Sequence, residues 1–404
     1  MSWRPLLEGA DADRAREAIA AIAADLAADV PATADLDRGL AGRALLHACL
    51  ARDGEAAAID RAAEALEQAL DGMGRLSNPW LLEGLSGVAW TAAHLGDVVE
   101  LDAETMEVLD QLVAESLAHE KWPFEWEYVA GLIGPSVYAL ERPGRAGEAL
   151  CSRVVGHLAA LAERHPAGIT WRSPPRMLSP EEMELNRDGY YNLGLAHGVV
   201  GVIGFLARAV DTPGARELLE GAVGWLCAHD TGSPASRFPY GLIRGRDDAG
   251  PRRDGWCYGD LAAGLTLIRA GLAASHSDWI EHGLSVAREV VGREPDDLET
   301  SMCHGTTGRA HLFNRMAQAT GDALLAEAAR DWYRATLARR QPGRGIGGYR
   351  AERGPGLDGS LLLGAAGVAL GLLAAVSPVE PAWDRALLID LPPTGARPPS
   401  NYGS

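Results

Sequence analysis

Two kinds of apolar segment alternate along the chain. The first kind mixes apolar positions at helical spacing with Asp, Glu and Arg, which predicts amphipathic helices with one solvent-exposed face. The second kind, as in residues 199–210 and 361–376, carries few charges and predicts helices that are buried on most sides. The amphipathic segments are residues 11–29, 55–71, 102–119, 146–164, 214–229, 277–292 and 322–340.

A Gly-x-x-Gly-like turn begins each weakly charged segment. Successive copies lie 45 to 67 residues apart, and their first residues are Gly39, Gly84, Gly131, Gly198, Gly259, Gly305 and Gly364. Glycine costs a helix about 1 kcal/mol relative to alanine. Its repeated use therefore predicts either a close approach of neighbouring backbones or turns with positive φ.

Seven amphipathic and seven glycine-led segments predict an all-α chain of helix pairs. Such pairs can close into an α/α toroid of seven inner and seven outer helices, which removes the exposed apolar ends of an open array. An open superhelix is the alternative, but the sequence shows no distinct polar caps. In a toroid the starts of the inner helices lie together, and this predicts that His197, Cys257, Cys303 and His304 converge.

The composition supports one large core. Apolar residues make up 47% of the 404 residues and charged residues 23%, whereas only 6% are aromatic, which favours close-packed helices over sheets. Together with the repeat, this predicts a single domain over residues 1–404. The last part of it, residues 392–404, is rich in Pro, Gly and Ser and is predicted to be a flexible tail.

The charge balance excludes one class of partner. A net charge of −18 argues against nucleic acid, whose binding requires clustered Lys and Arg. Residues 1–8 lack the basic and apolar parts of a signal peptide, and no apolar run reaches the roughly 18 residues of a membrane span. We therefore expect a cytoplasmic protein without a transmembrane segment.

Cysteine usage separates two groups of thiols. Five cysteines without framework spacing fit a reducing compartment. Cys49, Cys151 and Cys227 lie in apolar helical stretches and are expected to be small buried residues. Cys257 and Cys303 differ, because their neighbours are glycine and polar residues.

Cys257, Cys303 and His304 form a candidate metal site. Zinc prefers thiolate and imidazole ligands, and three protein ligands leave a fourth position for water or substrate. Metal binding would keep a substrate thiol deprotonated at neutral pH, which suggests that thiol as a nucleophile. Two buried cysteines near a capping histidine are the alternative, since no paired Cys-x-x-Cys signature is present.

Two further residues are candidates for catalysis. His197 lies at a predicted helix start, which favours the neutral imidazole needed for proton transfer, although a structural histidine is the alternative. Arg253, four residues before Cys257, can stabilise an enolate or orient a peptide carbonyl; a surface ion pair is the alternative. The long loops over residues 166–192 and 231–253 either contact a ligand or simply link helices.

Three ordered motifs resemble those of the lanthionine synthetase C-like family. Residues 194–201 resemble its Gly-x-Ala-His-Gly motif, residues 256–259 its Trp-Cys-Tyr-Gly motif and residues 303–305 its Cys-His-Gly motif. The resemblance implies an α/α toroid with Zn²⁺ held by Cys257, Cys303 and His304. It also implies His197 as the catalytic histidine, Arg253 as a catalytic arginine and a role for Tyr258 in the same motif.

The sequence departs from the family pattern at two places. The family often carries an aspartate four residues before the third glycine turn, where this chain has Glu127, and the sequence leaves open whether its longer side chain reaches His197. The usual Pro-Gly after Trp-Cys-Tyr-Gly is replaced by Leu261 and Ala262, which removes no ligand.

The resemblance implies a zinc-dependent lanthipeptide cyclase. Cysteine thiolates of a dehydrated precursor peptide would add to dehydroalanine or dehydrobutyrine and form lanthionine or methyllanthionine rings. A dehydratase and an export transporter are the implied partners, with a peripheral position at the membrane in a biosynthetic complex. A prenyltransferase-type zinc barrel fits the motif order less well. A non-catalytic toroid that binds peptides or glutathione through its zinc is the other alternative, which the intact His197 and Arg253 disfavour.

Overall fold

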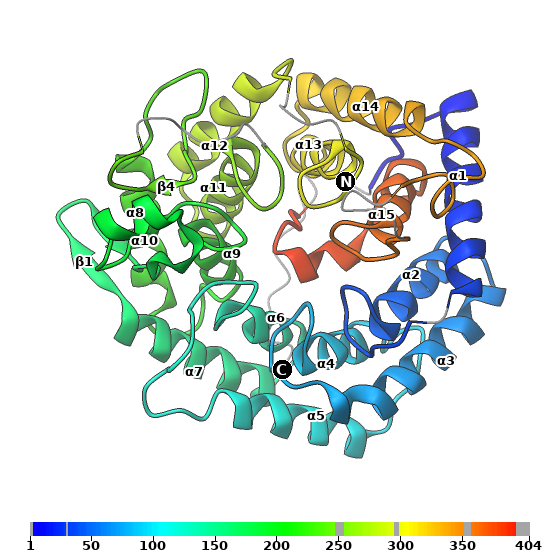
Figure 1. The fold of residues 1–404 in the computed structure, drawn as a ribbon, viewed down its shortest axis with the longest axis horizontal. Helices are drawn as coiled ribbons and strands as arrows, with labels where there is room; N and C mark the ends of the chain where they lie inside the picture. Colours follow the sequence, from blue (N-terminus) through cyan, green and yellow to red (C-terminus); the bar gives the residue numbers. More distant parts are fainter. Residues whose placement is uncertain (1–2, 30, 247–253, 295–298, 351–356, 393–404) are drawn as a thin grey trace. The chain divides into compact units, whose positions relative to one another are not determined.

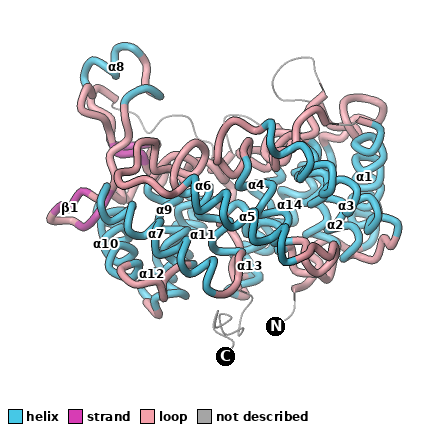
Figure 2. The backbone as a smooth tube through the Cα atoms, turned by 90° about the horizontal axis from the view of Figure 1, so that it is seen from below, coloured by secondary structure: helices cyan, strands magenta, loops and turns pink. Residues whose placement is uncertain are grey.

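The computed structural model describes residues 3–29, 31–246, 254–294, 299–350 and 357–392, most of which lie in helices (Figure 2). The chain forms two compact units. The first unit comprises residues 1–116 and 297–404, and the second comprises residues 117–296. Within the described ranges, no helix is both long and apolar enough to cross a membrane. The predicted tail, residues 392–404, lies almost entirely outside the described residues.

Pairs of helices build the first unit. Each pair joins a glycine-led helix to an amphipathic one: α2 with α3, α4 with α5, α13 with α14, and α15 with α1 (Figure 1). The glycine-led helices are α2 (Leu40–Arg52), α4 (Leu85–His94), α13 (Thr306–Thr320) and α15 (Ala365–Val376). The amphipathic helices are α1 (Gly9–Ala28), α3 (Ala57–Gly72), α5 (Ala103–Ser116) and α14 (Ala323–Ala338), and two 3₁₀ turns, η1 (Met73–Arg75) and η3 (Ala382–Leu387), complete the unit.

The second unit repeats this pairing. Its glycine-led helices are α6 (Ile133–Glu141), α9 (Val199–Arg208) and α11 (Asp260–Ala274). They pack against the amphipathic helices α7 (Arg145–Leu161), α10 (Ala215–Ala228) and α12 (Ser277–Val290), respectively. The described residues thus contain seven glycine-led and seven paired amphipathic helices, as the sequence predicts.

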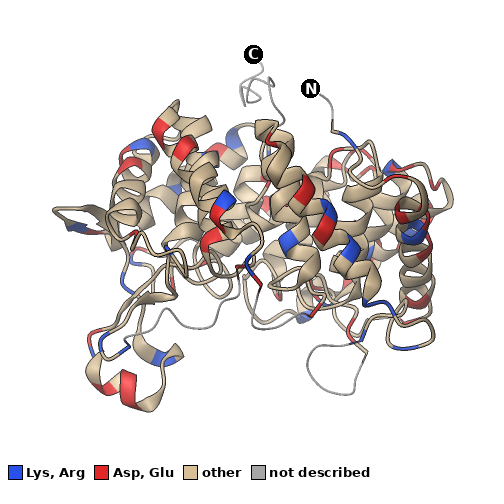
Figure 3. Cartoon of the chain, turned by 90° about the horizontal axis from the view of Figure 1, so that it is seen from above, with Lys and Arg blue, Asp and Glu red and all other residues tan. Residues whose placement is uncertain are grey.

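The two long loops of the second unit contain short strands. In the first loop β2 (Gly168–Thr170) pairs antiparallel with β1 (Glu163–His165), which begins where the predicted helical segment 146–164 was expected to end, since α7 already stops at Leu161. Across the two loops β3 (Tyr191–Asn192) pairs antiparallel with β4 (Gly241–Leu242). The 3₁₀ turn η2 (Pro175–Met177) and the short helix α8 (Pro180–Leu185) lie between β2 and β3. Figures 2 and 3 show α8 at the end of a loop that stands away from the other helices of this unit.

Burial distinguishes the two helix types. All 12 residues of α15 are buried, whereas the 20-residue α1 buries only Ala15, Ala18, Ile19, Ile22 and Leu26. A fully buried Leu or Ile side chain contributes about 1.5–3 kcal/mol relative to an exposed one. The core therefore lies mainly around the glycine-led helices, and the amphipathic helices cover it with one face.

Close backbone packing explains the repeated glycines. A Cβ atom at Gly42 would overlap the carbonyl oxygen of Leu36, and one at Gly308 would overlap that of Met302. Most of the leading glycines have ordinary extended backbone, with φ of −103° at Gly39 and −90° at Gly305. Gly259 is the exception, with φ of 104°. Of the two predicted reasons for glycine, close approach therefore applies generally and positive φ applies at Gly259.

Backbone hydrogen bonds connect successive turns within each unit. In the first unit Asp37 N donates to Leu82 O (2.9 Å), Leu361 N donates to Asp37 O (2.8 Å) and Cys303 N donates to Leu362 O (2.9 Å). Leu82, Asp37, Leu361 and Cys303 lie just before α4, α2, α15 and α13, respectively. Each helix in this series packs against the next one. The starts of the four glycine-led helices are thereby fixed relative to one another, and Cys303 is part of that arrangement.

Candidate functional site

Cys303 and His304 lie in the turn that begins α13. Both are buried, with 8% and 7% of their surface exposed. His304 N donates to Ser301 Oγ (3.3 Å), and Thr306 N donates to Glu299 O (2.9 Å). Together with the bond from Cys303 N to Leu362, these contacts fix the backbone on both sides of two adjacent potential metal ligands.

Glu299 is a polar neighbour of His304 that the sequence analysis missed. Its Oε1 atom lies 3.8 Å from His304 Nε2 and accepts a hydrogen bond from Ser301 Oγ (2.6 Å). A Cβ atom at Gly305 would meet Ser301 N and the Glu299 carboxylate, so glycine is what lets this carboxylate approach the turn. At this distance the two groups interact by charge and not through a hydrogen bond, and the negative carboxylate favours a proton on the nearer ring nitrogen, Nε2.

Cys257 lies in the turn before α11 of the second unit and is 6% exposed. Its carbonyl oxygen accepts hydrogen bonds from Leu195 N (3.0 Å) and Ala196 N (3.2 Å), the residues just before His197. The backbones of the first and second motifs of the sequence, residues 194–201 and 256–259, are therefore not independent. The turn that carries His197 is hydrogen-bonded to the turn that carries Cys257.

Arg293 braces the Cys257 turn and is another residue that the sequence analysis missed. Its Nη1 atom lies 3.2 Å from each carboxylate oxygen of Asp254, which has a left-handed φ of 33°, and 2.9 Å from Asp260 Oδ2. Asp260 N donates to Asp254 Oδ1 (3.2 Å), and Gly255 N to Tyr258 O (2.9 Å). The positive guanidinium compensates two buried carboxylates and so stabilises a strained turn.

His197 and Glu127 form an oriented acid–base pair. His197 Nδ1 lies 2.6 Å from Glu127 Oε2, and 23% of the His197 side chain is exposed. Glu127 is buried and also accepts hydrogen bonds from Ala130 N (2.6 Å) and Val129 N (3.0 Å) of its own turn. A carboxylate this close favours a proton on Nδ1, so that in the neutral ring the lone pair lies on Nε2. The longer glutamate side chain does reach His197.

Tyr258 lies close to His197 within the second unit. Its ring stacks on Tyr240 with centroids 4.0 Å apart, and its hydroxyl accepts a hydrogen bond from Asn192 Nδ2 (3.0 Å). The rings of Tyr258 and His197 are 6.3 Å apart. Burial raises the pKa of Tyr258, despite the hydrogen bond from Asn192. The phenol is therefore neutral, and can act as a hydrogen-bond donor rather than as a base.

The structure brings together part of the predicted site within each unit. Glu127, His197, Cys257 and Tyr258 belong to the second unit, and Cys303 and His304 share one turn of the first. Arg253, the candidate catalytic arginine, lies outside the described residues. All three candidate zinc ligands are buried. Two thiols and one imidazole are ligands that bind zinc in preference to harder metal ions.

Comparison with known proteins gives consistent matches. Residues 30–388 match the family described as lanthionine synthetase C-like protein. The nisin biosynthesis protein NisC of Lactococcus lactis subsp. lactis is 23% identical over 283 residues, which are 64% of this chain and 67% of that protein. The solved structure of nisin cyclase superposes with a TM-score of 0.74 and 20% identity, covering 92% of this chain and 96% of that chain. This match confirms the predicted fold class, an all-α chain of the α/α toroid type.

Proposed function

The chain belongs to the lanthionine synthetase C-like family, and we propose that it is a lanthipeptide cyclase. Its substrate would be a dehydrated precursor peptide, whose cysteine thiolates add to dehydroalanine or dehydrobutyrine and form lanthionine or methyllanthionine rings. The similarity to NisC and to nisin cyclase supports this assignment. The partner dehydratase and transporter, and a position beside the membrane, belong to the same proposal.

We further propose that Cys257, Cys303 and His304 hold Zn²⁺. Three observations support this set: the ligand types, their burial and the hydrogen-bonded turns that carry them. When bound, zinc would keep a coordinated substrate thiol deprotonated at neutral pH. The Glu299 carboxylate, 3.8 Å from Nε2 of His304, would favour a proton on that nitrogen and so leave Nδ1 available as a ligand atom.

The orientation of the His197 imidazole by Glu127 is the observation that most strongly supports an enzymatic function. Addition of a thiolate to the β-carbon of a dehydroamino acid leaves an enolate, which must receive a proton at the α-carbon. His197 Nε2 can deliver that proton after taking it from the substrate thiol or solvent, while Glu127 stabilises the imidazolium through Nδ1. The neutral Tyr258 hydroxyl can donate a hydrogen bond to the developing enolate oxygen, and Arg253 would add positive charge there.

A turnover assay distinguishes a cyclase from a non-catalytic toroid that binds peptides or glutathione. Purified protein is incubated with a dehydrated precursor peptide, and free thiols are counted by alkylation and mass spectrometry. Cyclisation leaves the peptide mass unchanged and removes the alkylation shift, faster than in a reaction without protein. Wild-type protein that retains zinc and peptide but leaves the thiol count unchanged would favour the binder.

Two variants separate metal binding from proton transfer. Cys303→Ala is expected to lose zinc and cyclisation together, because a ligand is removed. His197→Asn is expected to keep zinc and lose rate, because only the proton carrier is removed. Metal content is measured by elemental analysis of the purified proteins. A Cys303 variant with the zinc content of the wild type would contradict the assigned ligand set.

A further inference from the structure

Cys227, at the end of α10, faces a histidine of the neighbouring outer helix. Its Sγ atom lies 3.5 Å from Nδ1 of His282 in α12. The other ring nitrogen, Nε2, lies 2.7 Å from Oδ2 of Asp230, which follows α10. Cys227 is partly exposed, and 23% of the His282 side chain is exposed. The imidazole of His282 thus contacts the thiol of Cys227 through one ring nitrogen and the carboxylate of Asp230 through the other.

The carboxylate fixes the proton on the histidine ring. Nε2 lies 2.7 Å from Asp230 Oδ2 and 3.0 Å from Arg237 Nη2, which itself bonds the same carboxylate oxygen. The shorter contact to the carboxylate favours a hydrogen on Nε2, which leaves the lone pair of the neutral ring on Nδ1, toward the sulfur. The thiol S–H can therefore donate to Nδ1. The ring of His282 also packs beside the buried Phe238, with centroids 6.2 Å apart, which restricts its rotation.

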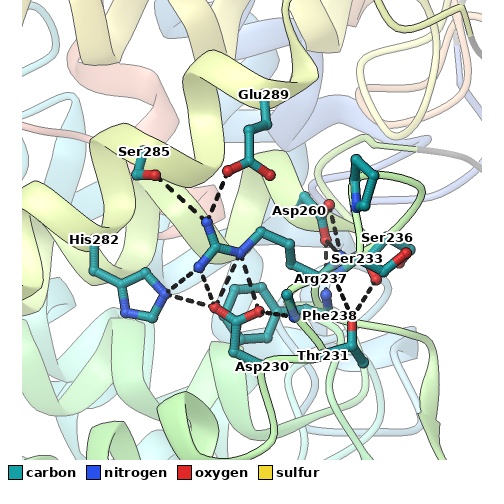
Figure 4. Close-up of polar contacts among 12 residues, drawn as sticks. Asp230, Thr231, Ser233, Ser236, Arg237, Phe238, Asp260, His282, Ser285 and Glu289 are labelled. Carbon is teal, nitrogen blue, oxygen red and sulfur yellow. Dashed lines mark hydrogen bonds and ion pairs between the residues drawn. The ribbon is translucent and has the colours of Figure 1, made fainter.

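Arg237 keeps Asp230 ionised and in place. Its Nε atom lies 3.0 Å from both carboxylate oxygens of Asp230, its Nη2 atom also contacts Oδ2, and Nη1 lies 3.1 Å from Glu289 (Figure 4). Burial alone would raise the pKa of Asp230, but hydrogen bonds from Arg237, Gly232 N and His282 lower it to about 2. Asp230 is therefore a permanent acceptor for His282.

Cys227 needs such a base in order to react. Burial raises the pKa of its thiol to about 11, so the resting side chain is protonated at neutral pH. The nucleophile of thiol chemistry is the thiolate, and an adjacent oriented imidazole is a general means of forming it during reaction.

We propose that Cys227, His282 and Asp230 form a second thiol site, at which Cys227 adds to electron-poor alkenes. As Sγ bonds to the β-carbon, the thiol proton moves to His282 Nδ1 and the alkene electron pair moves onto the conjugated carbonyl. The imidazolium then returns the proton to the α-carbon. The product is a thioether, His282 is again neutral, and no oxidant or reductant is consumed. This inference does not depend on the function proposed above.

Acrylamide, an electron-poor alkene of low reactivity, is a suitable probe because the rate at which it alkylates a cysteine depends on formation of the thiolate. The purified full-length chain is incubated with it at neutral pH, and adducts at each cysteine are followed by peptide-resolved mass spectrometry. Cys151 in α7 is the internal control, since it is buried and burial raises its pKa to about 12. We expect Cys227 to react at least about tenfold faster than Cys151.

Variants of the base separate activation from simple exposure. His282→Gln is expected to lower the Cys227 rate by about 10²-fold, the range for a positioned general base. Asp230→Asn is expected to lower it as well. His229→Gln is the matched control, because His229 lies near Cys227 but its Nδ1 contacts Trp225 O (2.7 Å); it should leave the rate unchanged.

Unfolding cannot imitate the expected result. A variant that loses its fold would expose Cys151 and Cys227 together and raise both rates, which the same measurement reveals. Equal Cys227 rates in the wild type and in folded His282→Gln protein would overturn the proposal. So would a Cys227 that reacts no faster than Cys151.

Discussion

The carboxylate of Glu127 receives three hydrogen bonds, two from its own turn and one from His197. Glu127→Gln keeps the size of the side chain and removes its charge, so the imidazolium of His197 loses its stabilising partner. We expect the cyclisation rate to fall by about 10²-fold with zinc content unchanged. The measurement is the initial rate of thiol loss from a dehydrated peptide.

Glu125→Gln is the control for this variant. Glu125 belongs to the same loop, but it pairs with Arg176 (3.0 Å). It should keep the wild-type rate. A Glu127→Gln protein that is as fast as the wild type would show that His197 does not need its carboxylate partner.

Glu299 provides the second prediction at this scale. Removal of a carboxylate that orients a metal-binding histidine typically lowers metal affinity by about 10–100-fold. Glu299→Ala is therefore expected to bind zinc that much more weakly, as measured by competition with a chromogenic chelator. Glu327→Ala, an exposed residue of α14 in the same unit, should leave the affinity unchanged. Equal affinities of the two variants would argue against the role of Glu299.

Sequence reasoning identified the residues with distinctive chemistry but not their neighbours. His197, Cys257, Cys303 and His304 stand in recognisable motifs, whereas Glu299 and Arg293 have no such local signal. Arg293 reaches Asp254 across 39 residues, through a turn whose left-handed backbone is not readable from side-chain type. The partner of His197 could be named only through a family resemblance, and its contact distance required the structure.

The helices themselves were largely predictable, because each combines a long periodic pattern with a glycine turn. Residues 322–340 were expected as a helix, and α14 spans Ala323–Ala338. The start of α8 also follows a pattern that is readable in the sequence, because Ser179 is followed three residues later by Glu182, and the two form a capping box. The β3–β4 pair was missed, because strands of two residues carry no pattern and their partners lie about 50 residues apart.

The glycine turns give a prediction at the level of elements. A methyl group at Gly42 would overlap the carbonyl oxygen of Leu36, so Gly42→Ala is expected to destabilise the protein by about 1–3 kcal/mol. Gly156 in α7 is the matched control. It has open space around its Cβ position, so Gly156→Ala should stabilise the protein by up to about 1 kcal/mol. Denaturant titrations measure both values, and two changes of the same sign would contradict the packing argument.

For the molecule as a whole, one buried acid couples stability to pH. Burial raises the pKa of Asp37 from 3.8 to about 6, although the hydrogen bond from Leu362 N opposes this shift. The folded state then holds this proton more tightly than the unfolded state. The resulting stability is fully present below pH 3.8 and is lost as the pH rises through about 6.

Asp37→Asn removes this titration and keeps an oxygen that can accept the Leu362 N–H bond. At pH 8 the variant should exceed the wild type in free energy of unfolding by about 3 kcal/mol. The difference should shrink toward zero as the pH falls to about 4. Unfolding is measured for both proteins across this range. A difference that stays constant with pH would mean that Asp37 does not titrate as described.

The pairing of α1 with α15 has a consequence for synthesis on the ribosome. In the first unit the apolar face of α1, which begins at Gly9, packs against α15, which begins at Ala365. This face therefore stays exposed until the residues between the two helices and α15 itself have been synthesised. The second unit is contiguous, and it can complete its internal contacts much earlier. We therefore expect the second unit to fold before α1 can pack against α15.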